Sequence, residues 1–326
     1  MKFNPSMIKM WSRIGSRASF GLAALELGKN HQDLIIISGD TSTSAGLERF
    51  KNNFPDKYLD VGIAEQNMMG IAAGLSSEGQ SVITTTFAPF QTMRCCEQIK
   101  VNLGYMNHKV IMVGLASGLS LGILGYTHCS IEDIGVLRSI PGITIISPAD
   151  SASTIKATLS AINHEQSVYI RLTGPVPNPP VYSDDFEFII GKSNIIADYG
   201  NDIAIISCGS MVYNALKASE LLNNQEFKTT VIDMHTIKPI DENMLEKISK
   251  NFKLIVTVEE HNVIGGLGSA VAEYISGISQ SPPLLKIGIQ DSYGEAGSYH
   301  ALLEKKKLMP NQIFKKISAK YQTIRF

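Results

Sequence analysis

Cysteine, charge and long apolar runs are all scarce in this chain of 326 residues, and each scarcity excludes a class of protein. Four cysteines are too few for a disulfide scaffold of this length, and their spacing matches no zinc site. The 29 Lys and Arg are balanced by 30 Asp and Glu, so there is no basic excess for binding nucleic acid. The first residues lack the apolar core of a secretory signal, and no apolar stretch is long enough to span a bilayer. We therefore expect a globular, cytoplasmic protein that binds neither nucleic acid nor membranes.

What the sequence does contain is an alternation of short β-branched runs with longer stretches of helical character. In the first half the expected strands are Leu34–Ser38, Ser81–Thr85, Val110–Val113 and Thr144–Ser147. The expected helices are Ala18–Leu27, Glu65–Ser77, Phe90–Leu103, Ile131–Ser139 and Ser151–Ala161. Strands that are apolar on both faces and alternate with helices predict a parallel sheet covered by helices.

A proline-rich segment, TGPVPNPPVYSDD, interrupts this alternation after residue 172. Proline fixes φ and restricts the preceding residue, so the segment favours extended backbone. The alternation then resumes, with strands expected at Asp202–Ser207, Thr229–Asp233 and Leu254–Glu259 and helices at Met211–Leu222, Asp241–Lys250 and Gly268–Ser276. We therefore expect an α/β protein with two domains, residues 1–175 and 189–326, joined by a linker at 176–188.

Two segments of the first domain carry candidate catalytic residues. Glu65, in DVGIAEQN, is expected at a strand-to-helix junction, where the helix N-terminus favours its charge and apolar neighbours disfavour it. About 20 residues later, TTFAPF places Phe87 and Phe90 three positions apart after a strand. Taken singly, a helix-capping glutamate and two core aromatics are the favoured explanations.

Two further candidates stand at expected loop positions. His128 follows a glycine-containing turn in GYTH, where it is either an ordinary loop residue or a ligand contact. Asp40 ends SGD directly after a strand, and open α/β sheets bind their ligands at such strand ends.

The motifs, taken together and in order, resemble the transketolase family. The runs DVGIAEQNMMGIAAGL, TTFAPF, THCSIEDIGVLRSIPGITIISPAD and YIRL look like this family, and VIDMHTIKPID, VEEHNVIGGLG and DSYGEAGSYHALLEKKKL are similar to its C-terminal domain. The GDG motif with a downstream Asn, which holds Mg²⁺ and diphosphate in the family, does not occur. The chain therefore resembles the C-terminal subunit of a split transketolase, with a parallel-sheet pyrimidine-binding domain followed by a smaller α/β domain.

The resemblance implies that thiamine diphosphate binds between this chain and another one. Glu65 matches the catalytic glutamate that hydrogen-bonds the aminopyrimidine ring, and Phe87 and Phe90 match the aromatics that line the pyrimidine pocket. Asp40 matches an acidic residue near the thiazolium and the substrate. His128 matches a histidine that contacts the donor ketose, and we expect it to be catalytic as well.

Arg17, Ser44 and Arg171 match positions that hold the substrate phosphate, a role that suits the planar fork of arginine. Two positions depart from the family pattern: Leu124 replaces an acidic residue, and Ala116 replaces a second histidine that contacts phosphate. Leucine cannot accept a hydrogen bond from a sugar hydroxyl, and an unpaired buried hydroxyl is costly. We therefore expect a deoxy, branched or otherwise specialised sugar rather than the ordinary pentose phosphates.

The resemblance also implies a partner, because this chain offers only the pyrimidine side of the cofactor site. We expect an α₂β₂ assembly in which an N-terminal subunit holds the diphosphate and Mg²⁺, this chain holds no metal, and its C-terminal domain supplies no direct catalytic group. The expected reaction transfers a two-carbon ketol unit between phosphorylated or modified sugars. The alternatives are the β subunit of a 2-oxo acid dehydrogenase, an enzyme similar to 1-deoxyxylulose-phosphate synthase that uses pyruvate, and an inactive scaffold subunit.

Overall fold

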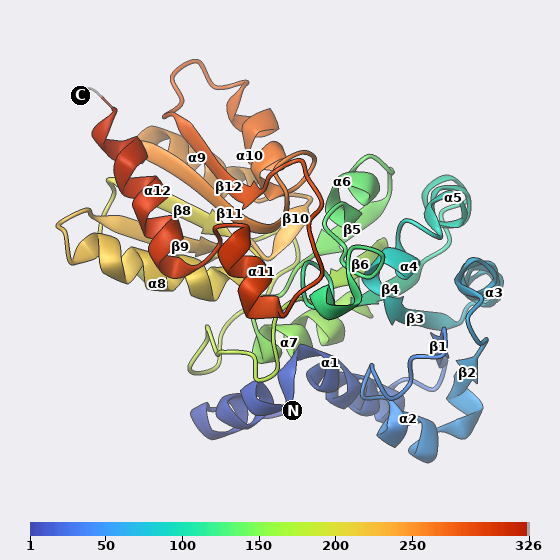
Figure 1. The fold of residues 1–326 in the computed structure, drawn as a ribbon. Coiled ribbons are helices and arrows are strands. Elements are labelled where there is room, and N and C mark those ends of the chain that lie inside the picture. The colour runs from blue at the N-terminus through green and yellow to red at the C-terminus, as the bar shows by residue number, and fades with distance from the viewer. Residues whose placement is uncertain (325–326) are drawn as a thin grey trace.

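Two largely parallel sheets organise the structure, a computed structural model that describes residues 1–324 (Figure 1). The first sheet has the strand order β10-β5-β6-β4-β3-β1-β2. Its strands are β1 (Leu34–Ser38), β2 (Tyr58–Asp60), β3 (Ser81–Phe87), β4 (Val110–Leu115), β5 (Ile143–Ile146), β6 (Ser167–Arg171) and β10 (Thr236–Lys238). Strands β1 to β6 pair in parallel and β4, β5 and β6 are buried throughout, which explains their β-branched, apolar sequences.

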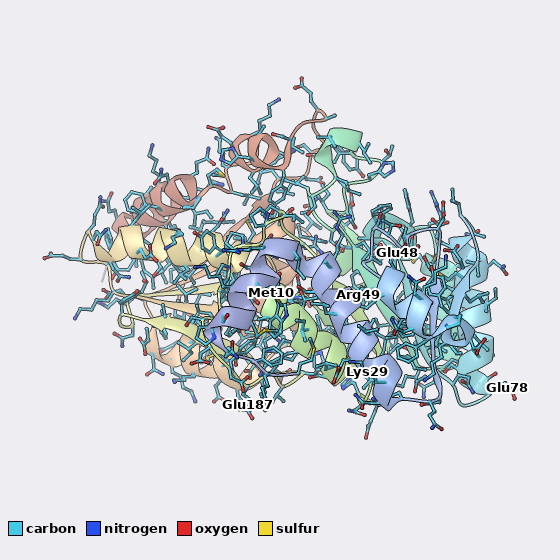
Figure 2. All side chains as sticks on the ribbon, turned by 90° about the horizontal axis from the view of Figure 1, so that it is seen from below. Met10, Lys29, Glu48, Arg49, Glu78 and Glu187 are labelled. Atoms are coloured by element: carbon cyan, nitrogen blue, oxygen red, sulfur yellow. The ribbon has the colours of Figure 1, made fainter. Side chains whose placement is uncertain are left out.

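Helices cover both faces of this sheet, and loops at its edge connect them to the strands (Figure 1). They are α1 (Pro5–Asn30), α2 (Glu48–Asn53), α3 (Glu65–Ser77), α4 (Ala88–Gln91), α5 (Cys96–Gln98), α6 (Asp133–Arg138) and α7 (Ser151–Ala161), with short turns η1 (Pro55–Lys57), the π-helix η2 (Ile99–Tyr105) and η3 (Gly122–Leu124). Seen from below, the blue α1, marked by the exposed Met10 and Lys29, runs beside the green α7 (Figure 2). Buried Trp11, Ala152 and Ile155 pack between these two helices.

The second sheet has the order β12-β11-β8-β9-β7 and lies in the yellow-to-red part of the chain (Figure 1). Its strands are β7 (Asn194–Asp198), β8 (Ile203–Ser207), β9 (Thr229–Asp233), β11 (Leu254–Asn262) and β12 (Leu284–Ile289). Its helices are α8 (Met211–Asn223), α9 (Glu242–Asn251), α10 (Leu267–Ile275), α11 (Tyr299–Lys305) and α12 (Pro310–Gln322). None of the helices within residues 1–324 combines the length and apolar character needed to cross a membrane.

The predicted α/β class with parallel sheets is confirmed, but one local expectation was wrong, and the first sheet contains a strand from later in the chain. The predicted helix Phe90–Leu103 is broken into α4, α5 and the π-helix, and the Thr92 hydroxyl and the Cys95 thiol bond back to carbonyls in this stretch. Strand β10 follows the linker in sequence, yet it pairs antiparallel with β5 of the first sheet, with Thr236 opposite Ile146. A segment from beyond the expected domain boundary therefore completes the first sheet.

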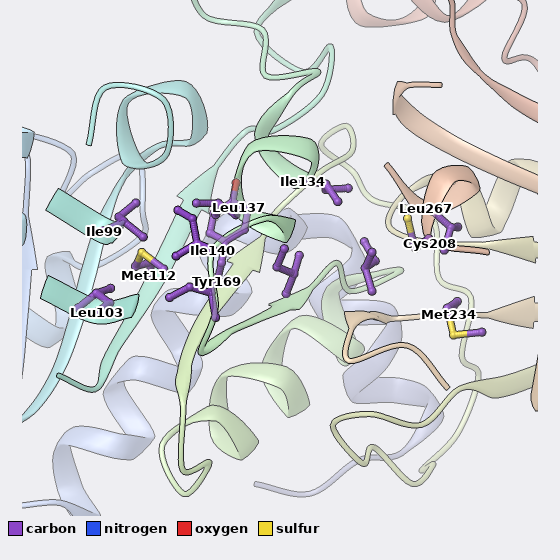
Figure 3. Close-up of a cluster of buried hydrophobic side chains, with 14 of the residues drawn as sticks. Ile99, Leu103, Met112, Ile134, Leu137, Ile140, Tyr169, Cys208, Met234 and Leu267 are labelled. Carbon is purple, nitrogen blue, oxygen red and sulfur yellow. The ribbon is translucent and has the colours of Figure 1, made fainter. Parts of the chain in front are cut away.

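The two sheets share a continuous apolar core. One cluster extends from Met112 and Tyr169 in the first sheet to Cys208, Met234 and Leu267 beside the second (Figure 3). All five side chains are fully or almost fully buried. The two halves therefore pack as one unit rather than as separate bodies on a flexible tether.

The proline-rich linker is fastened to both halves. Asp150, which caps α7, also accepts the backbone N–H groups of Val181 and Tyr182 through its second oxygen. The Tyr182 hydroxyl donates to Asp233 at the end of β9, at 2.7 Å. The Tyr182 ring stacks on Phe186, with ring centroids 3.6 Å apart.

Candidate active site

The candidate site lies along the carboxyl ends of the parallel strands of the first sheet. In a parallel sheet these ends meet at one edge, so residues that follow different strands come together. Asp40 follows β1, Glu65 follows β2, and the segment Phe87–Phe90 begins at the last residue of β3. The loop that carries His128 follows β4.

Glu65 opens α3 with its side chain only 3% exposed. Its Oε1 accepts a hydrogen bond from Nη1 of Arg94 at 2.8 Å, so the carboxylate pairs with another side chain. The end of β1 closely approaches this carboxylate. If residue 39 had a Cβ atom, that atom would lie 3.4 Å from Cγ of Glu65. Glu65 is therefore a buried charge held by one cation.

Aromatic rings surround this ion pair. Cζ of Arg94 lies 4.0 Å from the ring centroid of Phe90, close enough for a cation–π interaction. Phe90 contacts His128 edge-on at 5.3 Å between centroids and Phe87 at 6.4 Å. The structure thus brings Glu65, Phe87, Phe90 and His128 together, as the resemblance implies.

Sequence reasoning missed Arg94, the cation of this group. The available signal was its spacing, because Arg94 comes four residues after Phe90 in the expected helix Phe90–Leu103, and residues four apart on a helix lie on the same side. The exposed fraction of its side chain is 41%, so the guanidinium reaches the pair from the solvent side.

Asp40 has a strained backbone, with φ of +56° in the left-handed region. Its N–H donates to Oδ1 of Asp60 at 3.2 Å, and the same oxygen accepts the N–H of Gly62, so the β1 and β2 ends are tied together. The Asp40 side chain itself is exposed at this edge. Such strain is concentrated at functional sites. Ser44 lies half-buried in the loop that follows.

Arg17 lines a cavity of about 280 Å³ between the two halves of the molecule. α1 bends at Gly15, whose φ is +79°, beside Val176 of the linker. Ala116, with φ of +52°, and Tyr299 line the same cavity. Burial lowers the pKa of the Arg17 guanidinium from its ordinary value, which shows that this cation is partly withdrawn from water.

Arg171 occupies a different environment from the one the resemblance implies. Its side chain is 1% exposed, and Nε donates to Oδ2 of Asp133 at 2.8 Å. Nη2 donates to the carbonyl oxygens of Ser130 and Glu260 at 3.0 and 2.9 Å. A phosphate could contact this guanidinium only by displacing those partners, so we do not place Arg171 among the substrate contacts.

The loop that carries His128 has an apolar rim. Ile123 and Leu124 of η3 are 71% and 53% exposed, which is high for aliphatic side chains. Nδ1 of His128 lies 3.0 Å from the hydroxyl of Thr127. Leu124 therefore stands at the surface near the candidate site without an oxygen to offer a ligand.

Among residues 1–324, His, Cys, Asp and Glu form no group of three or more that could hold a metal ion.

The sequence matches the family of the transketolase pyrimidine binding domain over residues 12–175 and that of the transketolase C-terminal domain over residues 191–313. The chain belongs to the transketolase family. That family uses thiamine diphosphate.

Along most of its length the chain is similar to transketolase subunits of two bacteria. It is 38% identical over 291 residues to an apulose-4-phosphate transketolase subunit of Phocaeicola vulgatus, covering 89% of this chain and 92% of that one. It is 36% identical over 289 residues to a 6-deoxy-6-sulfo-D-fructose transketolase subunit of a Clostridium species, covering 89% of each. A solved structure titled "Split gene transketolase, inactive beta4 tetramer" matches 95% of this chain and 99% of its own, with a TM-score of 0.85 and 33% identity.

The residues at the candidate site fit the aminopyrimidine of thiamine. Such a ring is flat and carries N–H donors, so it needs a carboxylate at its edge and an aromatic ring against its face. The guanidinium of Arg94 is also flat and also carries N–H donors. It donates a hydrogen bond to Glu65 and lies against the ring of Phe90. Glu65 and Phe90 would hold the pyrimidine, and Phe87 would extend the aromatic wall.

Proposed function

We propose that this chain is the C-terminal subunit of a thiamine-diphosphate-dependent transketolase that transfers a two-carbon ketol unit between sugars and is active only with an N-terminal subunit. The observation that carries the proposal is the group formed by a buried Glu65, the two phenylalanines and His128. It combines a carboxylate able to share a proton with a flat apolar surface, and both lie at the edge where parallel sheets bind ligands.

Thiamine diphosphate, when bound, supplies the carbanion chemistry of the transfer. Glu65 shares a proton with the pyrimidine ring, and its burial keeps competing water away from that hydrogen bond. Phe87 and Phe90 orient the ring, and Asp40 presents its carboxylate from the end of β1. His128, held against Phe90, contacts the donor sugar.

The partner in this proposal is an N-terminal subunit that holds the diphosphate and Mg²⁺. The two bacterial relatives, each covered along 89% or more of its length, are themselves named as subunits of a transketolase rather than as whole enzymes. The matching solved structure is titled an inactive β4 tetramer of a split-gene transketolase. These names support an assembly of α₂β₂ type in which this chain is the β component.

Replacement of the buried carboxylate tests the catalytic proposal. In the complex reconstituted with the diphosphate-binding subunit, Glu65→Gln keeps the shape of the side chain but removes its ability to accept a proton. We expect turnover to fall by about 10²-fold or more, the scale of general acid–base catalysis. The matched control is Glu78→Gln, an exposed glutamate that follows the other end of α3 (Figure 2). Unchanged turnover in Glu65→Gln would favour the scaffold alternative.

The substrate in this proposal is a specialised sugar, with Arg17 and Ser44 contacting its phosphate or another terminal anion. The supporting observations are Leu124 at the rim of the site and Ala116 in the cavity with Arg17. The same complex, assayed with ordinary pentose phosphates, deoxy, branched and sulfonated sugars, and pyruvate, compares kcat/KM directly. Equal values for pentose phosphates and every modified sugar would contradict this assignment, and a preference for pyruvate would favour the synthase-like alternative.

A further inference from the structure

Glu260 of β11 connects the two halves of the molecule through both of its carboxylate oxygens. Oε1 accepts the backbone N–H of Leu119, in the first half, at 2.6 Å. Oε2 accepts the hydroxyls of Ser210 and Tyr299, in the second half, both at 2.7 Å. The carboxylate is 2% exposed, and three donors satisfy it. A buried carboxylate with this many short hydrogen bonds is a rigid anchor.

The chain segment that Glu260 anchors is the loop that carries His128. Gly118 and Ser130 exchange two backbone hydrogen bonds of 2.9 and 3.0 Å, which close residues 119–129 into a loop. Glu260 lies directly against this closure. If residue 118 had a Cβ atom, that atom would lie only 2.3 Å from Oε1 of Glu260. The φ of Gly118 is +69°, so glycine is required there for conformation as well as for space.

A second part of the C-terminal half clasps the same loop. The N–H of Gly297 donates to the carbonyl of Gly122 at 2.9 Å, and α11 lies against η3. A Cβ at Gly122 would fall 2.0 Å from Cδ1 of Leu302, so the two segments are in close contact. Further along the loop, the rings of Tyr126 and Tyr293 meet edge-on at 5.3 Å between centroids.

Tyr299, the first residue of α11, joins this anchor to the cavity around Arg17. Its hydroxyl donates to Glu260 and lies 3.1 Å from the hydroxyl of Ser210. Its side chain lines the cavity together with Arg17 and Ala116. A single side chain of the C-terminal half therefore contacts the anchor of the His128 loop and also forms a wall of the cavity.

We propose that Tyr299 is a positioning residue of the transferase: through Glu260 it fixes the loop of residues 119–129 and so the place of His128, and its ring shapes the cavity that receives the anionic end of the sugar. The proposal rests on the proposed function. It assigns a part in substrate binding to the C-terminal domain, which from the sequence we expect to supply no direct catalytic group.

Tyr299→Phe removes one hydroxyl and retains the ring, and two measurements read its effect. On the full chain alone, amide hydrogen exchange within residues 119–129 should become about tenfold faster, as expected for the loss of one hydrogen bond to a charged acceptor. In the reconstituted complex, KM for the sugar should rise by about tenfold while kcat changes less than threefold, and calorimetric binding of thiamine diphosphate should be unchanged. The matched control is Tyr213→Phe on α8, which should alter none of these values.

The outcomes separate this inference from the proposed function. Unchanged exchange in residues 119–129 overturns the anchor, and faster exchange with an unchanged KM overturns the role in substrate binding. If the wild-type complex shows no transketolase activity, the proposed function fails, and the exchange measurement still decides whether Tyr299 holds the loop. Should Tyr299→Phe fail to fold, Ser210→Ala, which removes the other hydroxyl from the same carboxylate oxygen, repeats the exchange test.

Discussion

Two arginine–carboxylate pairs with the same separation have opposite surroundings in this molecule. Arg94 with Glu65 and Arg171 with Asp133 both have N···O distances of 2.8 Å. In the second pair both side chains are at most 1% exposed, whereas Arg94 is 41% exposed. The length of an ion pair therefore says little about its role, and the burial of the cation separates a fixed structural pair from one that a ligand can replace.

The further contacts of the two guanidinium groups strengthen this contrast. Arg171 also donates to two carbonyl groups from different halves of the molecule, and Asp133 accepts the Tyr169 hydroxyl at 2.7 Å. Arg94 is held by Glu65 and the face of Phe90, and its side chain is open to solvent. Moving Arg171 would leave several buried polar groups without partners, whereas Arg94 can turn into water.

Breaking the buried pair should have the largest effect on stability. In Arg171→Met the carboxylate of Asp133 stays buried without its cation, so the free energy of unfolding should fall by about 3–5 kcal/mol. Chemical denaturation of the full chain measures this change. The double variant Arg171→Met/Asp133→Leu removes both charges and should recover part of the loss, since the Tyr169 hydroxyl and two backbone carbonyl groups still lack partners. A loss below about 1 kcal/mol in the single variant would contradict the structural role of the pair.

The buried region should also make stability depend on pH through Asp233. Burial raises the pKa of Asp233 from 3.8 to about 8, so the folded protein keeps a proton that the unfolded chain releases. Stability is therefore highest at low pH for this group and falls as pH rises toward 8. The pKa values of His235 and His261 are lowered to about 4, so these two groups change the free energy of unfolding only below pH 6.5. The pKa of Glu259 is raised to about 7, so its effect on the free energy of unfolding falls mainly below pH 7.

In the window from pH 7 to pH 8 Asp233 therefore makes the largest contribution, with a smaller one from Glu259. The free energy of unfolding should fall by about 1 kcal/mol across this window, since one proton per molecule is worth at most about 1.4 kcal/mol per pH unit. Asp233→Asn should remove most of this decrease, and Asp184→Asn, a substitution of an exposed linker residue, should retain it. An equal slope in Asp233→Asn and the wild type would show that another group titrates in this range.

Patterns that span many residues predicted their part of the structure well. The runs at Leu34–Ser38 and Ser151–Ala161 gave a strand and a helix with the observed bounds because burial on both faces and a capping Asp150 leave clear local signals. The α3 helix was likewise expected at its observed bounds, which placed Glu65 at its first turn. The residues around the candidate site were found by resemblance, since each of them alone had an ordinary structural explanation.

Features that depend on contacts between distant segments were not predictable in this way. Strand β10 has three residues, too few for a periodic pattern, and only its pairing with β5 makes it a strand. Arg94 and Arg171 are the same residue type, each close to a predicted site motif. Tertiary packing alone buries one between the two halves of the molecule and leaves the other at the surface.

Arg94→Met, the same substitution in the exposed pair, should have the smallest effect. The methionine chain can still cover Phe90, and because Arg94 is 41% exposed, water can enter the space that its guanidinium leaves beside Glu65. Because water can reach the Glu65 carboxylate in this variant but not the Asp133 carboxylate in Arg171→Met, the free energy of unfolding should fall by only about 1 kcal/mol in the same denaturation experiment. If both substitutions cost the same, burial of the cation would not distinguish the two pairs, and Arg94 would be as much a part of the folded framework as Arg171.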